Sequence, residues 1–128
     1  MDYERTRERL ECEIVAVRAR LVALDVELGA IHTASIDANT DDEHDPEGST
    51  IAFERARVAS LRAKSGARLI ELDQARLRLD SGCYARCTCC GAEISADRIA
   101  ALPAVTTCIS CATSPLGSRV RRAGTSNR

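Results

Sequence analysis

The sequence predicts a mainly α-helical protein: an antiparallel coiled-coil helical hairpin, then a small four-cysteine zinc-finger module and a flexible C-terminal tail. Three observations lead to this fold class. Two long segments carry apolar residues at heptad spacing, a short acidic stretch separates them, and two Cys-x-x-Cys pairs follow the second segment. The composition agrees, because 128 residues with 29% charged and only 2% aromatic side chains suit long solvated helices better than a thick core.

The first long helix is expected over residues 1–36. Apolar residues recur there at alternating spacings of four and three, which predicts a coiled-coil seam. This seam consists of Leu10, Ile14, Val17, Leu21, Leu24, Leu28 and Ile31. The other faces carry arginine and glutamate side chains of mixed sign, which we interpret as solvated. Cys12 lies within the same helical pattern, and we expect it to be a small buried or half-buried residue.

An acidic stretch over residues 37–49 separates the two helices and would form the tip of the hairpin. Five of the seven residues 41–47 are acidic. Pro46 ends any preceding helix and fits the first position of the next, with Asp45 or alternatively Ser49 as its cap. Carboxylates before a helix are stabilised by its dipole. However, five clustered acids repel one another, which suggests a basic partner or a bound divalent ion.

The second long helix is expected over residues 50–80, with a less regular seam of average period 3.5. This seam consists of Val58, Leu61, Ser65, Leu69, Leu72, Ala75 and Leu79. Gly82 suits the cap at its C-terminal end, where a left-handed residue is needed. Two seamed helices joined by a polar turn make an antiparallel hairpin, so residues 1–80 form the hairpin domain.

The two cysteine pairs predict a metal site in residues 81–112. Seventeen residues separate Cys87 and Cys90 from Cys108 and Cys111, a spacing that fits four thiolates around one zinc ion. Gly91 follows the first pair, where a tight turn needs a positive φ. Four thiolates leave no open position for water, so the zinc would be structural. Two disulfides, a redox Cys-x-x-Cys or an iron–sulfur cluster are the alternatives.

Three cysteines remain outside this set: Cys12, Cys83 and Cys89. Cys89 lies between two of the proposed ligands. It could replace one of them or respond to oxidation, and loss of zinc on mild peroxide treatment would identify such a role. The sequence does not assign a role to the other two.

The remaining features indicate a soluble cytoplasmic protein. Residues 113–128 contain four arginines and no acid, and we interpret them as a disordered basic tail. No apolar run approaches the ~20 residues that span a membrane, and the N-terminus has no apolar signal region. We therefore expect a cytoplasmic monomer without membrane contact. The reducing cytoplasm favours a metal over disulfides.

Several function classes can be weighed from the residues alone. We expect no enzyme, because the chain has no phosphate loop, no nucleophile–base pair and no open metal site. We expect no sequence-specific DNA binding, because Arg86 and Arg98 in the cysteine module are balanced by Glu93 and Asp97. A zinc ribbon that binds nucleic acid directly and an adaptor that assembles through its coiled coil stay open as alternatives.

A family resemblance is carried by a motif that runs through both cysteine pairs. The motif residues are Gly82, Tyr84, Cys87, Cys90, Gly91, Ile94, Arg98, Ile99, Ala101, Pro103, Cys108 and Cys111. Together with the hairpin, this motif resembles the DksA/TraR family of bacterial zinc-finger transcription factors. The resemblance implies a regulator that binds RNA polymerase, passes its coiled coil through the secondary channel and places the acidic tip near the catalytic centre.

The sequence departs from the family pattern at three places. The family tip has an Asp-x-x-Asp followed shortly by Ala; Asp42 and Asp45 supply the acids, but Pro46 follows. Aligning instead on the Asp-Pro step would put Gly48 at the second acid, so we take Asp42 and Asp45 as the partner-binding tip. Ala85 follows Tyr84 where the family has Gly. Leu102 precedes Pro103 where members that respond to ppGpp have a basic residue, which puts ppGpp binding in doubt.

Overall fold

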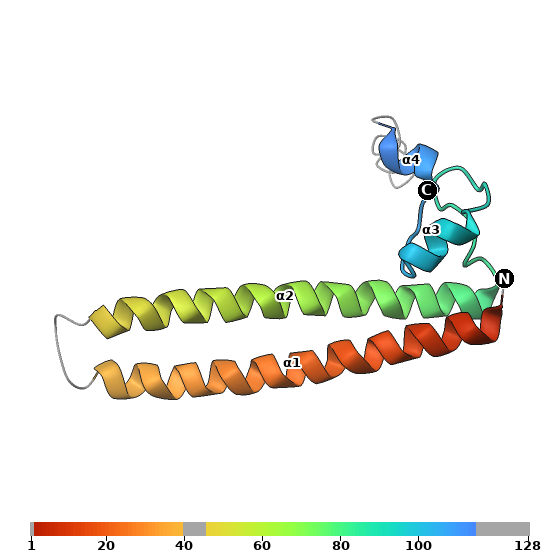
Figure 1. Cartoon of the computed structure of the whole chain (residues 1–128). Coiled ribbons are helices and arrows are strands. Elements are labelled where there is room, and N and C mark those ends of the chain that lie inside the picture. The colour runs from red at the N-terminus through yellow and green to blue at the C-terminus, as the bar shows by residue number, and fades with distance from the viewer. Residues whose placement is uncertain (1, 40–45, 115–128) are drawn as a thin grey trace, which may run out of the picture. The chain divides into compact units, whose positions relative to one another are not determined.

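Four helices make up the part of the chain that the structure describes. The structure is a computed structural model and describes residues 2–39 and 46–114. Its helices are α1 (Tyr3–Asn39), α2 (Pro46–Ser81), α3 (Ala96–Ala101) and α4 (Ile109–Thr113) (Figure 1). Within those residues there is no strand, only an isolated antiparallel bridge between Arg86 and Glu93. The predicted mainly α-helical hairpin followed by a four-cysteine cluster is confirmed.

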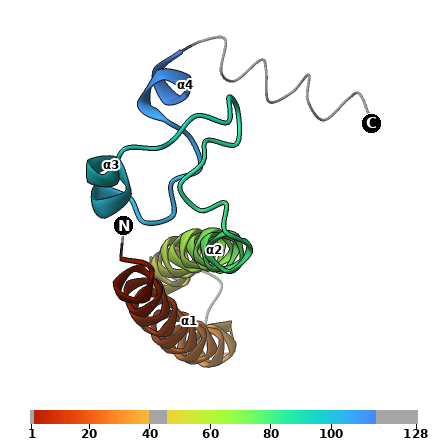
Figure 2. The same cartoon turned by 90° about the vertical axis from the view of Figure 1, so that its right-hand side faces the viewer.

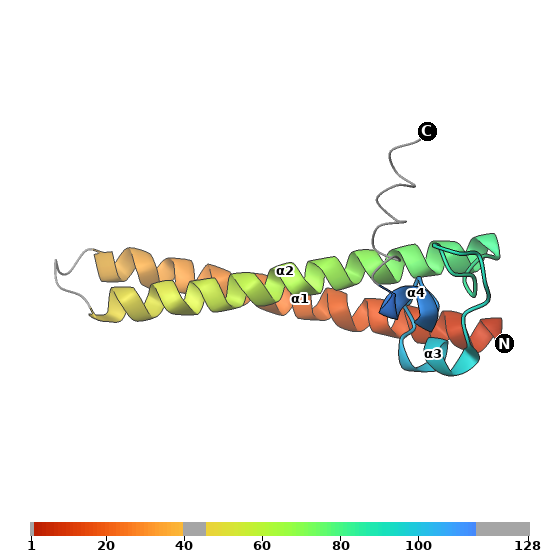
Figure 3. The same ribbon diagram turned by 90° about the horizontal axis from the view of Figure 1, so that it is seen from above.

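The chain divides into two compact units. One unit, Glu13–Ile70, consists of the larger parts of α1 and α2, which lie side by side and antiparallel (Figures 1 and 3). The other unit combines Met1–Cys12 with Glu71–Arg128 and contains the start of α1, the end of α2 and the cysteine module. The two long helices thus each contribute to both units.

The predicted seam of α1 is the side of that helix that is covered. All seven of its residues are buried or half-buried, and Leu10, Ile14 and Leu24 are at most 7% exposed. Along α2 the pattern holds less completely. Val58, Ser65 and Leu72 are buried, whereas Leu61 is 39% exposed. The prediction for Leu61 is therefore wrong, and the residue lies at the edge of the seam.

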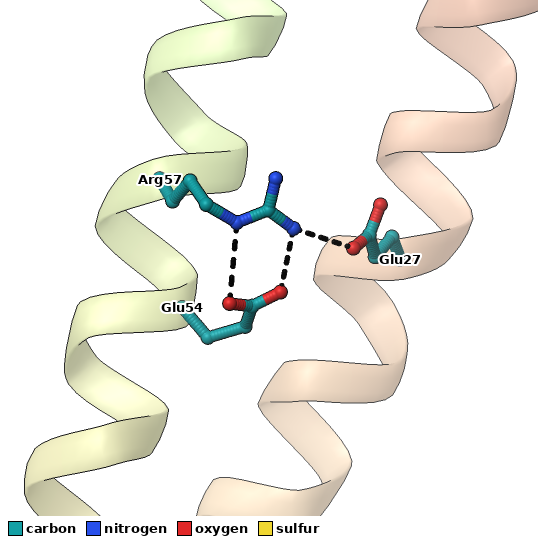
Figure 4. Close-up of polar contacts among 3 residues, drawn as sticks. All are labelled: Glu27, Glu54 and Arg57. Carbon is teal, nitrogen blue, oxygen red and sulfur yellow. Dashed lines mark hydrogen bonds and ion pairs between the residues drawn. The ribbon is translucent and has the colours of Figure 1, made fainter.

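Ion pairs between α1 and α2 flank the seam in the unit Glu13–Ile70. Arg68 pairs with Glu13 at 3.0 Å, and Arg62 pairs with Asp25. Arg57 holds both oxygens of Glu54 on its own helix and also reaches Glu27 on α1 at 3.3 Å (Figure 4). From Glu13 through Asp25 to Glu27 the acidic residues come later in α1, while their arginine partners come earlier in α2. These pairs therefore follow the antiparallel register.

Hydrogen bonds cap the start of α1 and the end of α2. Asp2 caps α1, because its Oδ1 accepts a hydrogen bond from the N–H of Arg5 at 3.1 Å. The helix α2 begins at Pro46, so the alternative start at Ser49 is excluded. At the other end of α2, Gly82 has a φ of +82°. The N–H of Gly82 bonds to the carbonyl of Leu79, and that of Cys83 to the carbonyl of Arg78, as in a Schellman cap.

Two of the sequence predictions lie outside the described residues. Asp42 and Asp45 fall in residues 40–45, and nearly all of the predicted tail falls in residues 115–128. The helix α1 continues farther into the predicted break than expected, to Asn39, whereas α2 begins at Pro46, where the proline predicted its first position. The apolar spacing missed the last turn of α1 because it detects only the part of a helix that has a covered side.

Candidate metal centre

The first cysteine pair is held by a tight turn after α2. The N–H of Cys87 donates to the carbonyl of Ala92 at 2.8 Å, and the N–H of Gly91 donates back to the carbonyl of Cys87 at 3.0 Å. Gly91 has the predicted positive φ, +74°. This backbone would strain a residue that has a Cβ. The turn brings Cys87 and Cys90 to the same side, and the N–H of Cys89 lies 3.4 Å from the sulfur of Cys87.

The second cysteine pair lies at the start of α4. Cys108 occupies the N-cap position and Cys111 lies in the only full turn of this short helix, so both sulfurs are near its N-terminal end. Thr88 joins this segment to the first turn, because its N–H and its hydroxyl both donate to the carbonyl of Thr106, at 2.8 and 3.1 Å. Figure 2 shows α3, α4 and the loops that connect them.

The structure brings together the four cysteines that the sequence predicts as ligands. The sulfurs of Cys87, Cys90, Cys108 and Cys111 all lie within 4.8 Å of one another. The sulfurs of Cys90 and Cys108 are 3.7 Å apart. Four sulfurs placed tetrahedrally at about 2.3 Å from a zinc ion would be separated by about 3.8 Å. All seven cysteines are free of disulfide bonds. The four sulfurs therefore fit a site for one metal ion.

The electrostatics of the cluster also favour a cation. Burial opposes ionisation of the Cys87 thiol, but hydrogen bonds from the N–H groups of Cys108, Cys90 and Cys89 lower its pKa to about 6. The pKa of Cys111 is raised, above all because the sulfur of Cys108 lies against it, with those of Cys90 and Cys87. Four thiolates this close repel one another, and a divalent metal supplies the charge that lets all of them ionise.

The three other cysteines lie outside the cluster. Cys89 is half-buried, and its sulfur is not among the four that converge. Cys83 is exposed, with its sulfur 3.2 Å from the hydroxyl of Ser81. Cys12 is exposed as well, so the expectation that it would be buried or half-buried is wrong. It lies on the side of α1 that faces away from the seam.

Arginine side chains fasten the loops of the module through backbone carbonyls. Arg98 donates from Nε to the carbonyl of Thr107 at 2.8 Å, next to the second cysteine pair. Arg78, near the end of α2, donates to the carbonyl of Val105 at 2.8 Å. Arg9, on α1, donates to the carbonyl of Ala100. Arg98 could be singled out in the sequence by its place in the motif, but the roles of Arg9 and Arg78 could not.

The fold and the site together define a helical-hairpin protein with a four-cysteine metal-binding module. No family model matches the sequence, and no curated protein sequence matches it. Among solved structures, the transcription factor DksA2 from Pseudomonas aeruginosa has the same fold, with a TM-score of 0.72 and 19% sequence identity. The match covers 98% of this chain and 86% of that one. The resemblance to the DksA/TraR family is thereby confirmed at the level of the fold.

Among the described residues, none of the helices is both long and apolar enough to cross a bilayer.

Proposed function

We propose that this protein is a transcription regulator that binds RNA polymerase through its secondary channel, with Asp42 and Asp45 at the tip that modulates initiation. One observation carries the proposal. A two-helix hairpin is attached to a four-cysteine module, and this arrangement is the fold of DksA2, which is a transcription factor. Transcription takes place in the cytoplasm of bacteria, so the protein would act there.

The lengths of the helices support a role for the acidic tip. The helix α1 has 37 residues and α2 has 36, so each is about 55 Å long at ~1.5 Å per residue. The acidic residues connect the end of α1 to the start of α2. A slender pair of helices of this length can carry a charged tip deep into a narrow channel, whereas a globular domain cannot.

Zinc is the metal that the donor set favours. Four thiolates are soft ligands, and zinc and iron–sulfur clusters are the usual occupants of such sites. One zinc ion bound by Cys87, Cys90, Cys108 and Cys111 would have no free coordination position, so it would hold the module together and perform no chemistry. The proposal therefore assigns the protein no catalytic activity.

Binding to purified bacterial RNA polymerase core enzyme tests this proposal. The zinc-loaded full-length protein is titrated against the polymerase, with a Gre-type factor as the competitor. We expect binding that the competitor displaces, since both would occupy the secondary channel. Binding that the competitor leaves unchanged would exclude that site. No binding at about 10 μM, with zinc present and the helices formed, would overturn the proposal as a whole.

A further inference from the structure

The first turns of α1, residues 3–12, belong to the same compact unit as the cysteine module. Met1–Cys12 group with Glu71–Arg128, whereas the rest of α1 groups with the larger part of α2. Leu10 is fully buried in this unit. The start of α1 is therefore held by the end of α2 and by the module, and not by the rest of the hairpin.

Side chains from the start of α1 and from the module face each other across a shared pocket of about 280 Å³. Those from α1 are mostly polar and those from the module are mostly apolar. The lining includes Arg5, Thr6 and Arg9 of α1 and Tyr84, Ile99 and Pro103 of the module. One direct bond crosses between the two sides, because the guanidinium of Arg9 donates to the backbone carbonyl of Ala100 in α3.

The carbonyl that Arg9 contacts lies in the loop between the two cysteine pairs. Seventeen residues separate Cys90 from Cys108, and Ala100 is among them. When both pairs bind one ion, the two ends of this loop are fixed, and a metal clip of this kind offsets the entropy cost of closing a loop. The position of the Ala100 carbonyl therefore depends in part on whether the four sulfurs hold a metal.

We propose that Arg9 couples the start of α1 to the metal site through the carbonyl of Ala100. Coupling between two sites is reciprocal. If a bound metal stabilises the contact between Arg9 and Ala100, the contact must strengthen metal binding by the same factor. Arg9 is thus a positioning residue for the metal site, although it lies outside the cysteine module. The inference rests on the metal site of the proposed function and is independent of RNA polymerase binding.

The coupling makes the start of α1 sensitive to the metal content of the protein. Loss of the metal frees the loop that contains Ala100, and the first turns of α1 then lose one of their two supports. The unit Glu13–Ile70 keeps its own ion pairs and stays helical. A partner that contacts the start of α1 would therefore distinguish the metal-loaded protein from the metal-free one.

Amide hydrogen exchange of the full-length protein, zinc-loaded and after treatment with a strong chelator, tests the coupling. Residues 7–12 report on the start of α1, and residues 20–30 of the same helix are the internal control. We expect chelation to speed up exchange at residues 7–12 at least ~10-fold and to leave residues 20–30 unchanged. Unchanged exchange at residues 7–12 would overturn the proposal. So would an equal increase along all of α1, because the whole hairpin would then depend on the metal.

Metal analysis of the loaded sample separates failure of the metal site from failure of the coupling. A protein that takes up no zinc would overturn the metal site and, with it, the role of Arg9. A protein that binds zinc but shows the same exchange at residues 7–12 with and without the metal would overturn the coupling alone.

Zinc affinity of Arg9 variants tests the reciprocal effect. Arg9→Ala removes the donor to Ala100 and should weaken zinc binding by about 3- to 10-fold in a competition titration with a zinc-binding dye. Arg9→Lys keeps a cationic donor and should recover part of that loss. The matched control is Arg18→Ala, which removes an exposed arginine of the same helix from the unit Glu13–Ile70. Equal affinities of Arg9→Ala and Arg18→Ala would exclude Arg9 from this role.

Discussion

The hydroxyl of Tyr84 donates a hydrogen bond to the backbone carbonyl of Pro103, 19 residues later in the chain. Tyr84 is 1% exposed and is the largest fully buried side chain among the described residues. It lies just before the first cysteine pair, and Pro103 lies in the loop before the second. Protein contacts therefore join the two halves of the module in addition to any contribution from the metal.

Removing this hydroxyl should weaken the module. Tyr84→Phe leaves the carbonyl of Pro103 without its donor, and we expect a loss of about 1–3 kcal/mol in the free energy of unfolding. Tyr84→Ala also removes the ring from the core and should cost about 3–5 kcal/mol. Denaturant unfolding of the zinc-loaded protein measures both values. If Tyr84→Phe unfolds like the wild type, the hydrogen bond does not stabilise the module.

Metal binding should depend on the four converging cysteines and on no other cysteine. Cys108→Ser removes one thiolate, and we expect the purified protein to lose most of its metal, since the remaining three sulfurs cannot complete the site. Cys83→Ser is the matched control, because Cys83 is exposed and lies outside the cluster. Metal analysis of the purified variants gives the ratio of zinc to protein. A comparable loss in the control would show that the ligand set is wrong.

Chelation of the metal should unfold the cysteine module but spare the long helices. The unit Glu13–Ile70 is held by its own seam and ion pairs, so it does not require a metal to fold. We expect most of the helical circular dichroism to survive a strong chelator, while the amide signals of residues 83–113 collapse in an NMR spectrum. Loss of the whole helical signal would contradict this separation.

Arg98 should tune metal affinity without touching the metal. Its guanidinium holds the carbonyl of Thr107, the residue directly before the ligand Cys108. Contacts of this kind orient metal ligands, so Arg98→Ala should lower zinc affinity by about 10- to 100-fold. Arg86→Ala, an exposed arginine of the same module, serves as the control. A competition titration with a zinc-binding dye compares the two, and equal affinities would remove Arg98 from this role.

Acid should destabilise the hairpin through its ion pairs. Hydrogen bonds from Arg62 and from Arg57 lower the pKa values of Asp25 and Glu54 respectively. A carboxyl whose pKa is lower in the folded state contributes stability above its unfolded pKa and loses it as the pH falls through the folded one. The melting temperature should therefore fall below about pH 4. The double variant Asp25→Asn/Glu54→Gln should show a smaller fall, and an identical fall would contradict this account.

The sequence predicted the features that depend on local chemistry. Gly82 and Gly91 both adopt the left-handed backbone that their neighbours indicated, and the seam of α1 is covered throughout. Spacing alone also identified the four cysteines that converge. Each of these features depends on residues that are close in sequence or that repeat at a fixed period.

The features that escaped prediction depend on contacts between distant residues. The short helices α3 and α4 have no periodic signal, and long-range bonds such as the one from Arg78 to Val105 fix the loops beside them. Cys12 was expected to be buried or half-buried but is exposed, because an apolar side chain within a helical pattern need not lie on the covered side of the helix.

The central claim, that the acidic tip acts on RNA polymerase, is tested most directly by transcription in vitro. The assay compares the wild type with Asp42→Asn/Asp45→Asn, and Glu8→Gln/Glu11→Gln serves as a control that removes the same charge from α1. We expect the tip variant to bind the polymerase and keep its zinc and helices, but to lose its effect on initiation, whereas the control stays active. A tip variant that regulates transcription as strongly as the wild type would contradict the account.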